Sequence, residues 1–334
     1  MSSVTAPGWR SALLALVVFL VLPLLPTALK TVIPVAQTWI LFTAALAVCA
    51  ALGWWNGGRI MAAAAAVLVA VAAALTPLWL AGTAYGGLVY GWTLLVCAAF
   101  GVASLLTPRE GFFVRALSAV GMAVVGSFVM ASITPGGTSN VRAVMLSEYG
   151  RRTDSTIGWF NHVTASPDWR KAAEKNPQLD AMAVSNEVDL RRLPDQAARL
   201  LPALVVLESL AALALAWVVY NRLSRTAAGP ELGSLRDFRF NDQLIWGLAV
   251  GATIFFLPVF QDGKSAGLNL LVFFGALYLL RGVGVLSCVT RGKWVGTLLI
   301  ILTIFAPTLL GALALGVGVG DTWMDWRTRA QSPT

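Results

Sequence analysis

Residues 201–220 read LPALVVLESLAALALAWVVY, a stretch in which Glu208 is the only charged side chain. A helix needs about 20 mostly apolar residues to cross the hydrocarbon core of a bilayer. The stretch therefore predicts a membrane-spanning helix. It also raises the question of why a carboxylate lies inside that helix, where a charge is costly.

The rest of the chain repeats this apolar pattern. Of its 334 residues, 57% are hydrophobic and only 12% are charged. Such a chain has far more apolar surface than one water-soluble core buries, which indicates a polytopic membrane protein. We predict an all-α fold, a polytopic transmembrane helical bundle with eight or nine spanning helices. The candidate spans are residues 11–29, 34–54, 60–82, 86–106, 112–133, 200–220, 244–260, 267–288 and 294–319.

The junction between the first two candidate spans is crowded by Pro23, Pro26 and Pro34. Proline removes a helical hydrogen bond and clashes with the preceding turn. The pair is therefore either two spans or one span followed by a broken or re-entrant segment. Irregular backbone survives at membrane depth only when other helices surround it.

Three regions follow from this pattern: a five-helix membrane region at 1–133, a polar loop at 134–198, and a membrane region of three to four helices at 199–334. The polar loop holds eight basic and eight acidic residues. We expect short amphipathic helices on the outer membrane surface, separated by Pro167, Pro177 and Pro194.

Lysine and arginine are unevenly shared between alternate short loops, and such an excess marks the cytoplasmic side. One side holds Arg10, Arg59, Arg109, Arg115, Arg222, Arg225, Arg236, Arg239, Arg291 and Lys293, and the other holds Lys30, Lys264, Arg327 and Arg329. We predict a multi-pass protein of a bacterial inner membrane, with a cytoplasmic N-terminus and an extracytoplasmic polar loop. The net charge of +8 then reports orientation and contact with anionic lipid, not nucleic-acid binding.

Two ionisable side chains lie well inside apolar runs, Glu208 in its span and Arg281 in the run FFGALYLLRGVGVLSC. A charge at the bilayer centre costs roughly 2.5 to 3.5 kcal/mol even on the insertion scale, so each needs a partner. Either the two side chains neutralise each other, or they face a water-filled cavity that holds a charged ligand. Glu208 and Arg281 are the candidate ligand-binding residues.

The chain end, GVGVGDTWMDWRTR at 316–329, has two interpretations. As a helix leaving the bilayer, its glycines allow close packing, and Trp323 and Trp326 anchor one face at the headgroups. Two acids so near the membrane edge are not needed for that purpose. Asp321, Asp325 and Arg327 are therefore a possible contact cluster.

Signatures of catalysis and of metal binding are missing from the sequence. It has one histidine and three cysteines, which lie apart, and DGKSAG at 262–267 lacks the earlier glycine of a phosphate-binding loop. We expect no enzyme activity, no metal and no cofactor. Transport driven by ATP would need separate ATPase subunits.

Four pieces of the C-terminal part carry a family resemblance. They are LLPALVVLESLAALALAWVVYNRL, LRDFRFNDQLIWGLAVG, LNLLVFFGALYLLRGVGVLS and LGVGVGDTWMDWRTR. In these pieces the chain resembles the YybS-like family of uncharacterised bacterial membrane proteins, a domain of unknown function. That family is distantly similar to the substrate-binding components of energy-coupling-factor vitamin transporters, which implies a membrane-embedded component that works with partner subunits.

Two functions fit these features. The first is a transport-type component that binds a small solute within its helix bundle and relies on partner subunits for energy. The alternative is a non-catalytic membrane scaffold or assembly protein, in which the 134–198 loop and the arginine-rich 221–242 segment recruit partner proteins. A cavity lined by Glu208 and Arg281 would favour the first.

Overall fold

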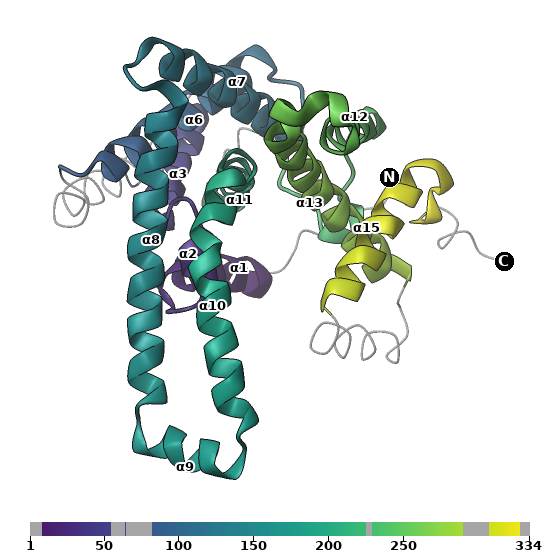
Figure 1. Cartoon of the computed structure of the whole chain (residues 1–334). Coiled ribbons are helices and arrows are strands. Elements are labelled where there is room, and N and C mark those ends of the chain that lie inside the picture. Colours follow the sequence, from purple (N-terminus) through teal and green to yellow (C-terminus); the bar gives the residue numbers. More distant parts are fainter. Residues whose placement is uncertain (1–8, 55–63, 65–81, 225–228, 290–306, 328–334) are drawn as a thin grey trace. The chain divides into compact units, whose positions relative to one another are not determined.

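All regular structure in the described part of the chain is helical. The computed structural model describes residues 9–54, 64, 82–224, 229–289 and 307–327, and its elements in these ranges are α-helices and short 3₁₀ helices (Figure 1). The chain divides into two compact units, the first formed by Trp9–Glu231 and the second beginning at Leu232. The predicted all-α class is confirmed for the described residues.

Four helices are long and apolar enough to cross a membrane. They are α6 (Ala84–Leu106), α7 (Phe112–Ile133), α11 (Leu201–Leu223) and α13 (Lys264–Val289). Each coincides with a predicted span, because an unbroken apolar run of more than 20 residues has few alternatives to a buried or membrane-crossing helix.

Shorter apolar helices account for most of the other predicted spans. They are α1 (Trp9–Val21), α3 (Thr38–Trp54), α12 (Ile245–Phe256) and α15 (Pro307–Met324). The prediction at 60–82 falls almost wholly outside the described residues, as does the first part of the prediction at 294–319. The number of eight or nine spans therefore stays a prediction.

The first predicted span is not one continuous helix. After α1 the chain forms a 3₁₀ turn, η1 (Leu22–Leu24), and then a five-residue helix, α2 (Ala28–Val32). Pro23 lies in the first turn of η1, and Pro26 follows it. A proline clashes with the carbonyl one turn earlier and disfavours a helical conformation in the residue before it, so the prolines explain this break.

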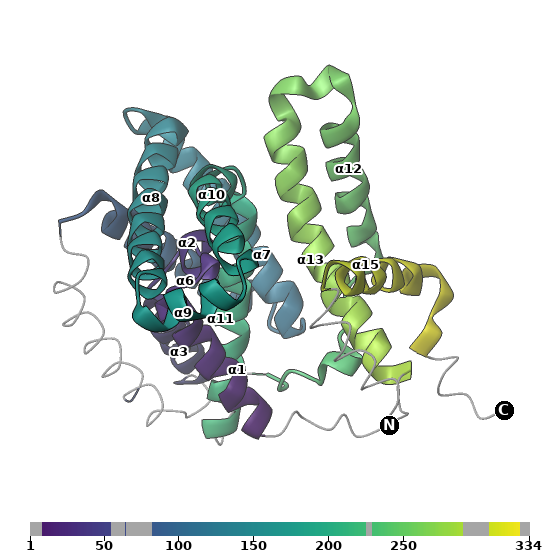
Figure 2. The same ribbon diagram turned by 60° about the horizontal axis from the view of Figure 1, so that its bottom comes forward.

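The polar region folds into a long helical hairpin. Helices α8 (Gly137–Thr164) and α10 (Gln178–Arg199) lie side by side and are joined by α9 (Pro167–Lys175) (Figures 1 and 2). With 28 residues, α8 is about 42 Å long, so the expectation of short helices was wrong.

The three prolines of the hairpin do not act alike. Pro167 begins α9 and Pro177 caps α10, positions at which a missing N–H leaves no helical hydrogen bond unmade. Pro194 lies inside α10 and does not end it, contrary to the prediction. Packing of α10 against α8, α2 and α11 outweighs the one hydrogen bond that Pro194 removes.

The hairpin shares a hydrophobic core with the membrane helices. Met145 and Tyr149 of α8 and Ala197 of α10 are buried together with Tyr85 of α6 and Ile40 of α3. The polar region is thus packed onto the bundle of the first unit, and this packing brings its charged side chains against apolar helices.

The second unit is built on α13, which packs against α12 and α15. Gly282 of α13 and Gly318 of α15 lie at the crossing, where a methyl group on Gly318 would overlap the Tyr278 carbonyl oxygen and one on Gly282 that of Ala314. The prediction that glycines of the terminal run allow close packing is confirmed at Gly318. At Gly316 a methyl group would meet no atom of the described residues within 4 Å.

Candidate functional site

An irregular segment, Ile33–Gln37, separates α2 from α3. Pro34 and Val35 within it are buried, so their backbone polar groups have little access to solvent. Buried backbone groups need hydrogen-bond partners, and in the described structure neither α2 nor α3 supplies one to Pro34 or Val35. The structure thus has the broken segment that the prolines of this region suggested.

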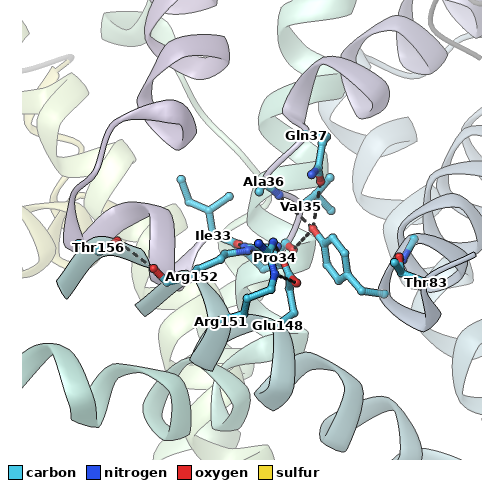
Figure 3. Close-up of polar contacts among 12 residues, drawn as sticks. Ile33, Pro34, Val35, Ala36, Gln37, Thr83, Glu148, Arg151, Arg152 and Thr156 are labelled. Atoms are coloured by element: carbon cyan, nitrogen blue, oxygen red, sulfur yellow. Dashed lines mark hydrogen bonds and ion pairs between the residues drawn. The ribbon is translucent and has the colours of Figure 1, made fainter. Parts of the chain in front are cut away.

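Three side chains from three different helices hold this segment, and we call Tyr85, Arg152 and Glu208 the clasp. The Arg152 Nη1 donates to the Ile33 carbonyl at 2.6 Å (Figure 3), and the Val35 N–H donates to the Glu208 Oε2 at 3.0 Å. The Tyr85 hydroxyl donates to the Pro34 carbonyl at 3.0 Å.

The same hydroxyl accepts the N–H of Ala36 at 3.2 Å. The clasp therefore satisfies donors and acceptors on four successive residues of the segment, a role that only surrounding helices can fill.

Arg152 is almost fully buried, with 2% of its surface exposed, and its charge is balanced within α8. Its Nε donates to the Glu148 Oε1 at 2.8 Å, and Arg151 donates to both oxygens of the same carboxylate. The Arg152 guanidinium carbon also lies 4.9 Å from the centre of the Tyr85 ring. These contacts place a cation between a carboxylate and an aromatic face, an arrangement that stabilises a desolvated charge.

Glu148 keeps its negative charge although it is buried. Burial tends to raise the pKa of its carboxyl group, but the hydrogen bonds from Arg151 and Arg152 outweigh burial and hold the pKa below its usual range. The carboxylate is therefore ionised at neutral pH.

Three polar atoms around the clasp are buried and find no hydrogen-bond partner among the described residues. They are the Glu208 Oε1, the Arg152 Nη2 and the Tyr149 hydroxyl. Glu208 is 9% exposed and Tyr149 is fully buried. Nearly all buried polar atoms in folded proteins are hydrogen-bonded, so this cluster has unused capacity to bind a small polar group.

Arg281 lies in a second charged cluster, in the other unit. Its Nε donates to the Asp321 Oδ2 at 3.0 Å, and its Nη1 donates to the Asp242 Oδ1 at 2.6 Å. The Arg327 Nε lies 3.8 Å from the same oxygen of Asp321. Glu208 and Arg281 thus each have hydrogen-bond partners within their own unit.

The proposed contact cluster at the chain end is only partly assembled. Asp321 and Arg327 lie together and are buried, while Asp325 forms an exposed ion pair with Arg239 at 2.6 Å. Asp325 has a φ of +40°, and α15 has ended at Met324.

The terminal helix α15 therefore does not continue through Asp325. Trp323 and Trp326 do not share one helical face, since Trp323 is 70% exposed and Trp326 contacts Gly320.

Arg327 stabilises this unit through hydrogen bonds to backbone carbonyls. It donates to the backbone carbonyls of Arg236 and Phe238 with Nη1 and to that of Arg281 with Nη2, at 2.8 to 3.0 Å. These bonds tie the polar segment before α12 to α13. In this cluster the Asp321 Oδ1 and the Arg327 Nε are also buried without a hydrogen-bond partner among the described residues.

A pocket of about 370 Å³ opens where the hairpin meets the chain before α2, and we call it the hairpin pocket. Its lining includes Pro26, Trp159, Phe160, Asp189, Leu190 and Leu193. Neither Glu208 nor Arg281 is part of that lining. Within the described ranges, no three His, Cys, Asp or Glu side chains gather closely enough to hold a metal ion.

Sequence reasoning missed Tyr85, Arg152 and Asp242. Arg152 stands in a charged loop, where the natural interpretation of an arginine is a solvated one. Its signal was the four-residue spacing from Glu148, which is typical of a helical ion pair. Asp242 stands just before a predicted span, and nothing in the sequence indicates that it faces Arg281.

Apolar helices of membrane-crossing length, with charged groups enclosed among them, define a helical integral membrane protein. Residues 175–322 match the model of a family described as "Predicted membrane protein (DUF2232)". That match includes Glu208, Arg281 and Asp321 but not the 33–37 segment or Arg152. No curated protein and no solved structure matches the chain.

Proposed function

We propose that the protein is a transport-type membrane component that binds a small solute within its helix bundle and relies on partner subunits for energy. The observation that carries this proposal is the clasp around Ile33–Gln37, in which the Glu208 Oε1 and the Arg152 Nη2 are buried and have no hydrogen-bond partner among the described residues. Discontinuous helices that expose backbone groups beside charged side chains are typical of solute sites in membrane transporters.

The chemistry of the clasp supports a solute with two kinds of polar group. The Glu208 Oε1 needs a donor, and the Arg152 Nη2 needs an acceptor. Both belong to ionisable side chains inside a bundle, where the low dielectric strengthens a well-placed hydrogen bond. Glu208 is thus the ligand-binding residue we retain, and Arg152 joins it. A ligand role for Arg281 is less favoured, because Asp242 and Asp321 already engage it.

Dependence on partner subunits rests on the resemblance to the YybS-like family and, through it, to energy-coupling-factor components. The same resemblance and the distribution of basic residues support a bacterial inner membrane and a cytoplasmic N-terminus. We further propose that the protein is not an enzyme and that any ATPase is a separate chain.

The experiment that tests this function is metabolite capture. The full-length protein, purified in mild detergent, is incubated with a soluble cell extract, and the molecules that it retains are identified by mass spectrometry. We expect at least one small polar molecule to be retained by the wild type and lost in Glu208→Gln.

Ser104→Ala is the matched control for this experiment. Ser104 is also a buried polar residue that has no hydrogen-bond partner in the described ranges, but it lies near the other end of α6 from Tyr85. The control should retain the same molecule. Equal retention by the wild type and by Glu208→Gln, or no retained molecule at all, would contradict the proposal.

A scaffold role is the second candidate, and the surface of α10 favours it. Met182, Val184 and Val188 are 61%, 66% and 44% exposed on this otherwise polar helix. Apolar side chains on an extended polar hairpin suit the recruitment of a partner protein. Loss of a co-purifying protein on changing Val184 and Val188 to serine, with the clasp intact, would favour this role.

A further inference from the structure

We infer that the hairpin pocket binds the ammonium group of an organic cation with an apolar body. The inference goes beyond the proposed function, because the lining of this pocket includes none of Tyr85, Arg152 and Glu208. It rests on the size, charge and aromatic lining of the pocket. The ammonium site in the pocket and the solute site at the clasp can therefore be refuted independently.

The size and walls of the pocket suit a small organic molecule. Its volume of about 370 Å³ falls within the range of small-molecule sites, roughly 300 to 1,000 Å³. Pro26, Leu190 and Leu193 supply aliphatic walls, and Phe160 supplies an aromatic one. An apolar body gains from contact with such a lining.

Asp189 gives the pocket its charge preference, since it is the one charged side chain that the described part of the chain contributes to the lining. Within the described ranges, no hydrogen bond or ion pair engages its carboxylate, whereas Glu148 and Glu187 on the same hairpin each pair with an arginine. Arg192 follows three residues later on α10, but it forms no ion pair with Asp189 and does not line the pocket. The carboxylate is therefore available to a cation.

Two aromatic side chains add a second attraction for the same charge. Trp159 and Phe160 both line the pocket, and the ring of Phe160 is held in place by an edge contact with Trp169 at 6.3 Å. A cation over an aromatic face is attracted by the ring quadrupole, most strongly with tryptophan. An ammonium group beside Asp189 and these rings combines ion pairing with cation–π attraction.

Two sources can supply this chemistry: a free amine and the ammonium headgroup of a phospholipid such as phosphatidylethanolamine. The test therefore uses the full-length protein in nanodiscs of phosphatidylglycerol, which has no ammonium group. The probe is 2-phenylethylammonium, and the comparison ligand is the neutral 2-phenylethanol. Binding is measured by saturation-transfer NMR and isothermal titration.

We expect the cation to bind more tightly than the neutral ligand, and Asp189→Asn to weaken only the cation, by about tenfold. Asp195→Asn, an exposed acid on α10 outside the pocket lining, is the matched control and should change neither affinity. Competition by added phosphatidylethanolamine would identify a lipid headgroup as the source, and lack of competition a free amine.

Three results would overturn the inference. They are equal affinity for the cation and the neutral ligand, equal affinity in wild type and Asp189→Asn, and no binding of the cation at millimolar concentration. Circular dichroism and the thermal midpoint of Asp189→Asn establish that the variant is folded. Because Asp189 is exposed, we expect both to equal the wild type.

Discussion

Arg152→Met is the substitution that tests the clasp most severely, because it keeps an unbranched apolar stem and removes the guanidinium group. The variant loses the bond to the Ile33 carbonyl and one partner of Glu148. Arg151 still pairs with Glu148, but its side chain is largely exposed and its hydrogen bonds go to Glu148. The Ile33 carbonyl is then left without its charged donor.

The expected loss follows from these contacts. A hydrogen bond from a charged donor contributes about 1.5 to 3 kcal/mol, and breaking a buried ion pair costs about 3 to 5 kcal/mol. Because Arg151 retains part of the ion pair, we expect the unfolding free energy to fall by about 3 to 5 kcal/mol in all. The assay is equilibrium unfolding in mixed micelles with increasing dodecyl sulfate, followed by circular dichroism.

The matched control is Arg191→Met. Arg191 also donates to a glutamate four residues earlier on the same hairpin, but its side chain is 58% exposed, against 2% for Arg152. An exposed pair of this kind contributes about 0.3 to 0.5 kcal/mol, so the control should be nearly neutral. If the two variants lost the same free energy within about 0.5 kcal/mol, the reasoning from burial and from the clasp would be refuted.

Two further predictions concern packing and pH. Gly318→Ala should lower the unfolding free energy by about 1 to 3 kcal/mol, because the added methyl group meets the Tyr278 carbonyl. Gly316→Ala is the control and should be neutral or slightly stabilising. Equal effects of the two variants in the same micelle titration would contradict this prediction. Glu148 has a folded pKa below its unfolded value, so its stabilising contribution is present above the unfolded pKa, near 4.3, and is lost as pH falls through the folded pKa. The stability difference between wild type and Glu148→Gln should therefore shrink between pH 6 and about pH 3, and a pH-independent difference would oppose the assignment.

The helical class and four of the helices could be predicted from hydropathy alone. A run such as 201–220 predicts a helix by its length and apolar character, without reference to the rest of the chain. The break before α3 was also readable, since Pro23, Pro26 and Pro34 each disfavour a continuous helix. These features depend on residues near one another in the chain.

The partners of the charged residues could not be predicted in the same way. Arg152 and Ile33 are 119 positions apart, and Arg281 and Asp321 are 40 apart, so only the tertiary fold brings them together. Glu208 is buried, as expected of an ionisable residue inside an apolar run, but its partner is the N–H of Val35, a backbone group that the sequence pattern does not indicate.

The hairpin shows a different limit of sequence reasoning. Its charged composition predicts solvent exposure, yet α8 buries Met145, Tyr149 and Arg152 against the bundle. Only one face of the helix is buried, and a count of charges over the whole loop averages that face with the exposed one. The positive φ of Asp325, which accompanies the end of α15, is likewise a local geometry that the spacing of acids and tryptophans does not reveal.

The most direct test of the proposed function is an experimental structure of the full-length protein purified from its native membrane. We expect density that belongs to no protein atom, larger than a single water molecule, within hydrogen-bonding distance of both the Glu208 Oε1 and the Arg152 Nη2. Direct pairing of Glu208 with Arg152, or burial of both atoms against the protein's own groups, would contradict a solute site at the clasp.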